Sequence, residues 1–343
     1  MHLIGDHIVV SEQALNYLKN YLESKKYSRI FVLVDENTAQ HCLPLFPDIA
    51  FQKIQIESGE SNKNLDTCTR IWDALLYGKA DRHSVLINLG GGMIGDIGGF
   101  AAATYQRGID FIHVPTSLLA MVDASVGGKT GVDYRDYKNM IGTFAEPAMV
   151  FIQPKMLDTL PERHFMAGYA EMLKHGLIAD VAYWKELGEL NKRRIKLQIE
   201  KSINIKKTIV DDDPYEKGQR KWLNFGHTLG HGIESYCLEQ GRDLLHGEAV
   251  AAGMFMEAII SAKTGLTHED IHSIRNTLDG LFPKAPIKES EATEIWGYVL
   301  GDKKNKSGNV NCTLLVTVGK AIYDVRIHFP EFQEALRIYL SAG

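Results

Sequence analysis

Residues 84–104, SVLINLGGGMIGDIGGFAAAT, join an apolar run to a glycine-rich turn and a helical pattern. The run from Ser84 to Gly90 is apolar at nearly every position, which is typical of a strand buried on both faces of a sheet. The glycines let a ligand approach the backbone, and the following helix presents free N–H groups and its positive end. The stretch therefore predicts a site for a nucleotide pyrophosphate, with a tight turn that binds nothing as the alternative. It departs from the usual G-x-G-x-x-G pattern.

The first half of the chain repeats this alternation of strand and helix. A helical spacing of apolar residues covers residues 64–77, and β-branched runs predict strands at residues 29–36, 51–58, 84–90, 111–115 and 149–154. Alternating strands and helices of this length form a parallel sheet covered by helices. We therefore expect an α/β domain over residues 1–155.

The second half reads differently. Helical patterns are predicted at residues 162–179, 181–211, 222–240, 247–264 and 267–281. Residues 312–319 and 320–327 then form two apolar runs that meet at Gly319-Lys320, which predicts a hairpin. We expect a mainly helical domain over residues 156–343.

Composition excludes several classes of protein. Lys and Arg number 38 against 43 Asp and Glu, a net charge of −5, which argues against nucleic acid as the main partner. The longest apolar stretch, residues 249–262, is interrupted by Glu257 and is too short to span a membrane. The four cysteines are far apart, which favours free thiols over disulfides or a thiolate zinc site. We expect a cytoplasmic protein.

Metal-type ligands gather in three motifs. His227 and His231 lie four residues apart in FGHTLGHGIE, and His246 is the third residue of LLHGEAVAAG. Glu171 lies three residues before Lys174 in AGYAEMLKHG. Nitrogen and oxygen ligands without thiolate suit Zn²⁺ in a catalytic site with open positions. Spacing alone favours His227, His231 and His246 as the ligands, and capping or core histidines are the alternative.

Strand ends offer further candidates for cofactor binding. Asp35 ends the strand FVLVDE, where a carboxylate can bind the ribose of NAD or cap the next helix. Glu60 and Lys63 follow the next strand at the same edge of the sheet, where a plain loop is the alternative.

Residues 115–144 form a long polar segment rich in glycine, with Asp123, Lys129, Lys138 and Asn139. We expect it to be a functional loop and not part of the core, since loops of this length in compact domains are usually functional. Further cations lie near other motifs, at Lys174, Lys206, Arg220, Lys303 and Lys304. Together they predict a substrate with both phosphate and carboxylate groups. For any one of these cations a surface position is the alternative, above all for Lys303 and Lys304 in the charged turn DKKNKSG.

Six motifs, in this order, carry a resemblance to a known family: GGGMIGDIGGF, MVDASVGGKTGVD, YKNMIGTF, AGYAEMLKHG, LNFGHTLGHGIE and LHGEAVAAGM. The chain resembles 3-dehydroquinate synthase, a sugar-phosphate cyclase of the shikimate pathway and so of aromatic amino acid biosynthesis. The resemblance runs from about Asp35 to about Lys304. It implies a Rossmann-like N-terminal domain and a helical C-terminal domain, a fold shared with polyol dehydrogenases such as glycerol dehydrogenase.

The resemblance changes the expected metal site. It implies Glu171, His227 and His246 as ligands of one divalent ion, Zn²⁺ or Co²⁺, and it turns His231 toward the substrate. We adopt this set in place of the one favoured by spacing.

The resemblance also implies the remaining site residues. Phosphate and carboxylate contacts map onto Lys129, Asn139, Lys174, Arg220, Asn224 and His231. Further active-site positions are Asp123, Lys206 and Glu216, with Lys303 or Lys304 as a substrate contact and Arg107 reaching across the interface of a homodimer. Contacts to NAD map onto Asp35, Glu60, Lys63, Gly91, Gly92, Asp96, Thr116, Ser117, Lys129, Lys138 and Thr159.

The implied reaction converts 3-deoxy-D-arabino-heptulosonate 7-phosphate into 3-dehydroquinate and phosphate. NAD removes a hydride from C5, phosphate leaves by β-elimination, the hydride returns, and the ring opens and recloses by an aldol step. Two positions depart from the family pattern: Ser117 replaces a threonine, and Asp133 stands where many bacterial members have asparagine. Asp133 adds negative charge near the expected phosphate contacts.

Three alternatives remain open. A related cyclase that makes valiolone or scyllo-inosose precursors acts on a substrate without the carboxylate. A polyol dehydrogenase would reduce NAD without returning the hydride, and it has no need of the cation cluster. An NAD-binding scaffold has no need of a metal triad. The set Lys174, Lys206, Arg220, Asn224 and His231 favours dehydroquinate formation.

Overall fold

The computed structural model describes residues 3–135, 137–301 and 310–341. The chain forms two compact units, residues 1–161 with 193–207 and residues 162–192 with 208–343. The first unit thus takes in a short later piece of the chain as well as the N-terminal half. The assignment of separate binding roles to residues 1–155 and 156–343 stays a prediction.

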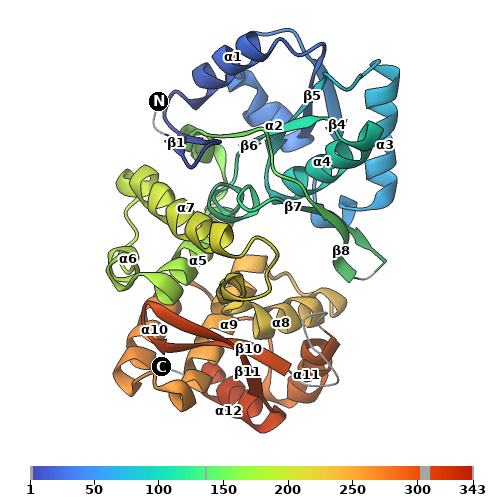
Figure 1. The fold of residues 1–343 in the computed structure, drawn as a ribbon. Coiled ribbons are helices and arrows are strands. Elements are labelled where there is room, and N and C mark those ends of the chain that lie inside the picture. Colours follow the sequence, from blue (N-terminus) through green and yellow to red (C-terminus); the bar gives the residue numbers. More distant parts are fainter. Residues whose placement is uncertain (1–2, 136, 302–309, 342–343) are drawn as a thin grey trace. The chain divides into compact units, whose positions relative to one another are not determined.

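A seven-stranded sheet is the centre of the first unit (Figure 1). In spatial order its strands are β1 (Leu3–Ile4), β2 (Ile8–Val10), β9 (Met149–Ile152), β6 (Asp110–Pro115), β5 (Val85–Gly90), β3 (Ile30–Asp35) and β4 (Gln52–Ile56). The pair β1–β2 is antiparallel, and the other pairings are parallel. Every residue of β5 is buried, as its continuous apolar run predicts. The parallel α/β class is confirmed.

Helices cover the sheet: α1 (Ala14–Lys25), α2 (Glu36–His41), α3 (Leu65–Tyr77) and α4 (Gly92–Thr104). The expected helix over residues 64–77 is confirmed, and Asn64 caps it by accepting the N–H of Thr67 at 3.0 Å. Figure 1 shows α3 and α4 beside β4, β5 and β6. Trp72 of α3 packs on this core and donates its indole N–H to the carbonyl of Ala101 at 3.1 Å.

The polar segment 115–144 is more ordered than the sequence suggests. It holds a π-helix (Ala120–Ala124) and an antiparallel hairpin of β7 (Lys129–Tyr134) and β8 (Tyr137–Phe144). Met121, Val122 and Val132 are buried, so the expectation of a non-core loop is wrong. The hairpin packs on α4 because Gly99 leaves room for the Thr130 methyl: a Cβ at Gly99 would lie 2.5 Å from it.

The second unit is mainly helical, as predicted. Its helices are α5 (Glu162–Ala179), α6 (Val181–Leu187), the end of α7 (Ile195–Asp212), α8 (His227–Glu239), α9 (His246–Ile260), α10 (His268–Leu281), α11 (Ala292–Gly301) and α12 (Phe329–Leu340). The hairpin of β10 (Val310–Thr317) and β11 (Lys320–Ile327) is confirmed. Helix α9 packs against α5, α8, α10 and α12 and is buried at every position except His246 and Ile259. Its residues are apolar or glycine except for His246, Glu248 and Glu257, which is typical of a helix at the core of its unit.

Three helical expectations need correction. The single helix expected over residues 181–211 is two helices, α6 and α7, and a 3₁₀ turn, Lys192–Arg194, precedes α7. The helix expected from residue 222 begins at His227, after a 3₁₀ segment, Gln219–Asn224. Helix α4 begins at Gly92, so most of the glycines predicted as a loop lie inside it. Helices α11 and α12 were not expected from the sequence. Among the described helices, none has the length and apolar character that crossing a bilayer requires.

We predict opposite effects for alanine at two helical glycines. A Cβ at Gly98 of α4 would lie 2.0 Å from Oδ1 of the buried Asn88, so Gly98→Ala must push α4 away from β5. We expect a loss of about 1–3 kcal/mol in the free energy of unfolding, as for other overpacked cores. The control is Gly280→Ala on α10, where a Cβ meets nothing within 4 Å. That change should gain about 0.4–1 kcal/mol. Urea unfolding measures both, and equal effects of the two changes would contradict the packing argument.

Candidate functional site

Three helices of the second unit bring the expected metal ligands together. Helix α5 carries Glu171, α8 begins at His227, and α9 begins at His246. Oε1 of Glu171 lies 3.4 Å from Nε2 of His227 and 3.8 Å from Nε2 of His246. The imidazole of His231 is also close, with its centroid 5.2 Å from that of His227 and 5.6 Å from that of His246. Both candidate ligand sets therefore lie in one cluster.

Hydrogen bonds orient the two histidines that approach Glu171. Nδ1 of His227 lies 3.1 Å from the carbonyl oxygen of Phe225, and Nδ1 of His246 lies 3.0 Å from Oε2 of Glu234. Each acceptor favours a proton on Nδ1, which leaves Nε2 of both rings with a lone pair directed at Glu171. This is the usual outer-shell arrangement around metal-bound histidines. Two imidazole nitrogens and one carboxylate oxygen suit Zn²⁺.

The side chain of Glu171 is fully buried and forms an ion pair with Lys174, which lies one helical turn away on α5. Burial alone opposes ionisation, yet the ammonium of Lys174 holds the pKa of Glu171 well below its usual range. Burial lowers the pKa of His227 and so favours its neutral, ligating form. The cluster thus offers an ionised carboxylate and a neutral imidazole at one point.

Glycines in the same motifs set the spacing of these helices. A Cβ at Gly253 of α9 would lie 2.0 Å from the carbonyl oxygen of Gly226, and one at Gly230 of α8 would lie 2.9 Å from that of Ala249. A Cβ at Gly247 would meet the backbone of Ala167 on α5 at 2.2 Å. The backbones of α5, α8 and α9 therefore approach closely because these positions carry no side chain.

Residues 213–224 contain three further predicted active-site residues. Arg220 is buried, and its guanidinium donates to the carbonyl of Pro214 at 2.5 Å. The amide nitrogen of Asn224 donates to Oε1 of Glu216 at 2.7 Å. Asp213 orders this segment by accepting the backbone N–H of Gly218 at 2.7 Å and of Arg220 at 3.1 Å. Arg220, Asn224 and Glu216 are thus fixed on one short segment.

The glycine-rich stretch of the first unit opens helix α4. Gly91 is the N-cap, Gly92 is the first helical residue, and the N–H of Thr116 donates to the carbonyl of Gly90 at 3.0 Å. A Cβ at Gly91 would lie 3.5 Å from Oγ of Ser117. The predicted contacts to NAD at Gly91, Gly92, Thr116 and Ser117 are therefore neighbours at one helix N-terminus, where anions are favoured.

Lys63 lies at the centre of an acidic cluster beside this helix. Its buried ammonium lies 2.5 Å from Glu60, 3.2 Å from Asp96 and 3.8 Å from Asp133. Burial raises the pKa of Asp96 to about 6, against the opposing charge of Lys63. The N–H of Asp133 on β7 donates to the carbonyl of Lys63 at 2.7 Å, which ties the β7–β8 hairpin to the cluster. Within the hairpin, Oδ1 of Asp133 accepts the N–H of Asn139 at 2.7 Å.

Two other predicted residues of the first unit bind each other. Lys206 donates to the backbone oxygen and to Oδ1 of Asp123, both at 2.6 Å.

Asp35 caps α2, since its Oδ1 accepts the N–H of Thr38 at 2.7 Å. The capping alternative for Asp35 is thus realised, and its contact with ribose stays a prediction.

Family models match two consecutive parts of the chain. A model of the 3-dehydroquinate synthase N-terminal region matches residues 53–167, and a model of the C-terminal region of the same family matches residues 168–305. A 3-dehydroquinate synthase of Parabacteroides distasonis is 41% identical over 331 residues, which covers 94% of this chain and 93% of the relative. One of Clostridium beijerinckii is 40% identical over 309 residues, 86% and 87% of the two chains.

This chain belongs to the 3-dehydroquinate synthase family. The resemblance inferred from the six motifs is thereby confirmed. Among solved structures, 2-deoxy-scyllo-inosose synthase in complex with carbaglucose-6-phosphate, NAD⁺ and Co²⁺ is similar with a TM-score of 0.83 and 25% identity over 96% of each chain. A probable glycerol dehydrogenase from Sinorhizobium meliloti shares the fold, with a TM-score of 0.62 and 14% identity over 97% of this chain and 96% of the other.

Several positions implied by the 3-dehydroquinate synthase family lie at the surface of their unit. Lys129, Lys138 and Asn139 are exposed on the β7–β8 hairpin, and Arg107 and Thr159 are exposed at the ends of short 3₁₀ segments. Lys303 and Lys304 lie outside the described residues. The binding roles of all these residues stay predictions.

Sequence reasoning missed Glu234, which orients His246. The signal was present: His227, His231 and Glu234 lie at positions i, i+4 and i+7, which share one face of a helix. A carboxylate on the face of two candidate ligands is a natural outer-shell partner.

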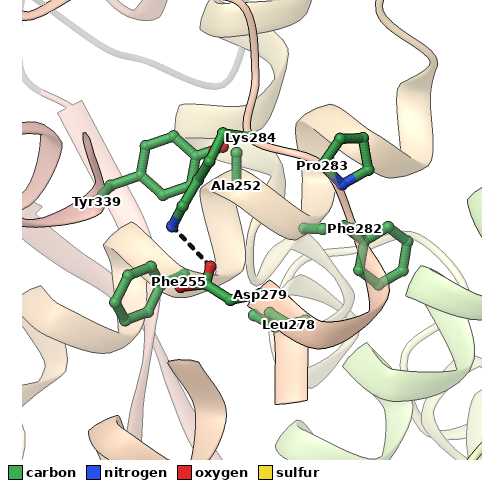
Figure 2. Close-up of a pocket in the computed structure, with 9 residues that line it drawn as sticks. Ala252, Phe255, Leu278, Asp279, Phe282, Pro283, Lys284 and Tyr339 are labelled. Atoms are coloured by element: carbon green, nitrogen blue, oxygen red, sulfur yellow. Dashed lines mark hydrogen bonds and ion pairs between the residues drawn. The ribbon is translucent and has the colours of Figure 1, made fainter. Parts of the chain in front are cut away.

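Figure 2 shows a pocket of the second unit that is lined by residues of α9 and α10, by residues 282–284 and by Tyr339 of α12. Nζ of Lys284 lies 4.4 Å from the ring centroid of Tyr339, 5.4 Å from that of Phe255 and 2.6 Å from Oδ1 of Asp279. The lysine is held by cation–π contacts and an ion pair. None of the predicted site residues lines this pocket.

We predict that Lys63→Met destabilises the protein more strongly as pH rises. Without the ammonium, the pKa of Asp96 should rise further above about 6, while in the unfolded chain it stays near 3.8. Because the native pKa of Asp96 is then higher than its unfolded pKa, the free energy of unfolding falls as pH rises from about 4 through 6 and beyond. Breaking a fully buried ion pair costs about 3–5 kcal/mol of unfolding free energy. The loss from Lys63→Met at pH 8 should be smaller, because Glu60, one partner of Lys63, is exposed to solvent.

Melting temperatures of wild type and variant at pH 5 and pH 8 test this. The control is Lys53→Met, which removes an exposed lysine of β4. A difference between wild type and Lys63→Met that stays constant across pH would contradict the prediction.

Proposed function

We propose that this chain converts 3-deoxy-D-arabino-heptulosonate 7-phosphate into 3-dehydroquinate and phosphate. Membership of the 3-dehydroquinate synthase family supports this activity. The observation that carries the proposal is the cluster of Glu171, His227 and His246, with Lys174 paired to Glu171. A site for a divalent ion beside a buried lysine suits a sugar that carries negative charge.

NAD and a divalent ion, Zn²⁺ or Co²⁺, are the cofactors of this proposal. The similar 2-deoxy-scyllo-inosose synthase is described with NAD⁺ and Co²⁺, and the valiolone synthase ValA, which shares the fold, with NAD⁺ and Zn²⁺. When bound, NAD accepts and returns a hydride, and the ion acts as a Lewis acid on the sugar oxygens. Glu171, His227 and His246 hold the ion, and His231 faces the substrate.

Residues 1–155 bind NAD in this proposal, and residues 156–343 bind the ion and the substrate. Gly91 and Gly92 place backbone N–H groups at the start of α4 for the pyrophosphate. The further contacts to NAD are Asp35, Glu60, Lys63, Asp96, Thr116, Ser117, Lys129, Lys138 and Thr159. Lys63 holds Glu60 and Asp96 in fixed positions through its ion pairs, so the two carboxylates are oriented before NAD arrives.

The substrate carries a phosphate and a carboxylate, which the chain meets with cations and amides. Arg220 offers a planar fork for one anion, and Asn224 is held ready by Glu216. Lys129, Asn139, Lys174 and His231 complete the anion contacts. Lys174 lies next to Glu171 and is therefore placed to stabilise negative charge that develops on the sugar oxygens.

Proton transfer is shared between the substrate and the chain. Oxidation at C5 acidifies the proton at C6, and the departing phosphate accepts that proton as the C7–O bond breaks. Lys206 and Asp123 form a hydrogen-bonded ion pair that can accept a proton from a sugar hydroxyl or donate one to it. Bound NAD would take a hydride from C5 and give it back, which leaves substrate and products at the same oxidation level.

A homodimer in the cytoplasm completes the proposal. Arg107 is exposed, as an arginine that reaches into the site of a second subunit must be. The four cysteines are free and buried, which suits a reducing compartment.

The cyclase that forms 2-deoxy-scyllo-inosose is the second candidate, because a solved structure of that enzyme covers 96% of this chain. Its substrate lacks the carboxylate. Lys174, Lys206, Arg220 and Asn224 together favour the substrate with two anionic groups.

A coupled assay tests the proposed activity. The purified chain is incubated with 3-deoxy-D-arabino-heptulosonate 7-phosphate, NAD and Zn²⁺, while phosphate and the absorbance of NADH are followed together. We expect one phosphate per substrate consumed and no accumulation of NADH. Accumulating NADH would identify a dehydrogenase, and no consumption of the heptulosonate would point to a scaffold or to a different cyclase.

Two alanine variants separate the candidate ligand sets. His246→Ala removes an expected ligand and should abolish metal retention, whereas His231→Ala should retain metal and lose turnover. Metal content after dialysis is measured by mass spectrometry, and circular dichroism checks that both variants fold. Loss of metal from His231→Ala would favour the three-histidine set that spacing alone suggests.

A further inference from the structure

Glu257 lies at the start of helix α8 although it belongs to α9. Its side chain is fully buried. One carboxylate oxygen accepts the N–H of Gly226 at 2.6 Å, and the other accepts the N–H of Leu229 at 3.1 Å. Both oxygens of a buried carboxylate are thus used on the first turn of the helix that begins at His227.

Helix α8 cannot supply this cap from its own sequence. The first turn of a helix has N–H groups without partners, which Ser, Thr, Asp or Asn at the N-cap normally bind. Here the N-cap is Gly226, in a left-handed conformation with φ of 78°. A Cβ at this position would lie 2.4 Å from Cγ of Met254 and 3.0 Å from the carbonyl oxygen of Val250. The close approach of α8 and α9 therefore excludes a capping side chain, and α9 provides the acceptor.

The two hydrogen bonds fix the backbone on both sides of His227. Gly226 directly precedes the histidine, and Leu229 follows two residues later. The ring is then oriented by its own contact with the carbonyl of Phe225. Displacement of Glu257 would let this turn move and carry Nε2 of His227 away from Glu171.

The same helix fixes the second histidine. His246 is the first residue of α9, and Glu248 accepts the preceding N–H, that of Leu245, at 2.9 Å. Glu248 also accepts from Arg163 of α5 at 2.6 and 2.8 Å, which ties α9 to the helix that carries Glu171. One rigid helix therefore holds His246 at its start and, through Glu257 three turns later, the backbone of His227.

We propose that Glu257 is a positioning residue that sets the affinity of the metal centre by fixing the backbone around His227. The inference rests on the proposed function only in taking His227 as a metal ligand. Glu257 touches neither the ion nor the substrate in this account, and it acts through the first turn of α8.

The test compares Glu257→Gln with a matched control. Glutamine keeps the size of the side chain but offers one acceptor oxygen, and it turns an amide N–H₂ toward a backbone donor. The control is Ser261→Ala, one turn further along, where a buried hydroxyl donates to the carbonyl of Glu257 and accepts the N–H of Leu315. That change also removes buried hydrogen bonds next to α9 but leaves Gly226 and Leu229 capped.

Three measurements are made on the full chain. Zn²⁺ affinity is determined by competition with a chromophoric chelator, the visible spectrum is recorded with Co²⁺, and amide hydrogen exchange at residues 226–229 is followed without metal. Glu257→Gln should weaken Zn²⁺ binding by about 10–100-fold, as for other outer-shell partners. It should also shift the Co²⁺ bands and speed amide exchange at residues 226–229. Ser261→Ala should lower the melting temperature yet keep Zn²⁺ affinity within about twofold, since it leaves the groups that orient the metal ligands untouched.

Two results would overturn the inference: wild-type Zn²⁺ affinity in Glu257→Gln, or an equal loss of affinity in Ser261→Ala. A wild-type chain that binds no Zn²⁺ would contradict the proposed function itself, and the inference with it. Should Glu257→Gln fail to fold, Glu257→Asp takes its place. Aspartate keeps the charge on a side chain one methylene shorter, and the same loss of affinity is expected.

Discussion

The buried carboxylate of Glu171 is the constraint on which the site depends. A charge in a water-free interior is costly unless opposite charges or hydrogen-bond donors surround it. In the second unit Lys174 pairs with it, and the imidazoles of His227 and His246 lie 3.4 and 3.8 Å away. A lysine and two histidines are thus gathered at one buried carboxylate, and the imidazoles and the carboxylate are ligand types that suit a divalent cation.

That centre exists because three helix backbones approach one another closely. Gly230, Gly247 and Gly253 stand where α5, α8 and α9 meet, and each would place a Cβ within 3 Å of a neighbouring backbone. Close packing leaves little space for capping side chains, so carboxylates on α9 serve the helix starts instead. The histidines are the first residues of α8 and α9, so the caps and the expected ligands occupy the same two turns.

Much of this could be predicted from the sequence, and the limits have physical reasons. The continuous apolar run of β5 identifies a strand of the parallel sheet, because that pattern is local. The glycines after it look like a loop, although most of them lie inside α4. Spacing alone favours His227, His231 and His246, and it does not report that Glu171 lies beside them, because that contact depends on how α5 packs. The hairpin in residues 115–144 was missed because Gly131 and Gly142 pair closely across its strands and look like loop residues. The contacts of Lys63 with Asp96 and Asp133 join distant segments, and local patterns do not report them.

Anomalous diffraction at the zinc edge, from crystals of the chain grown with Zn²⁺, tests the central claim most directly. The account predicts a single strong peak bonded to a carboxylate oxygen of Glu171 and to Nε2 of His227 and His246, at about 2.0–2.2 Å. His231 should lie outside the coordination sphere. A peak bonded to His231 with Glu171 left on Lys174, or no peak among these side chains, would contradict it.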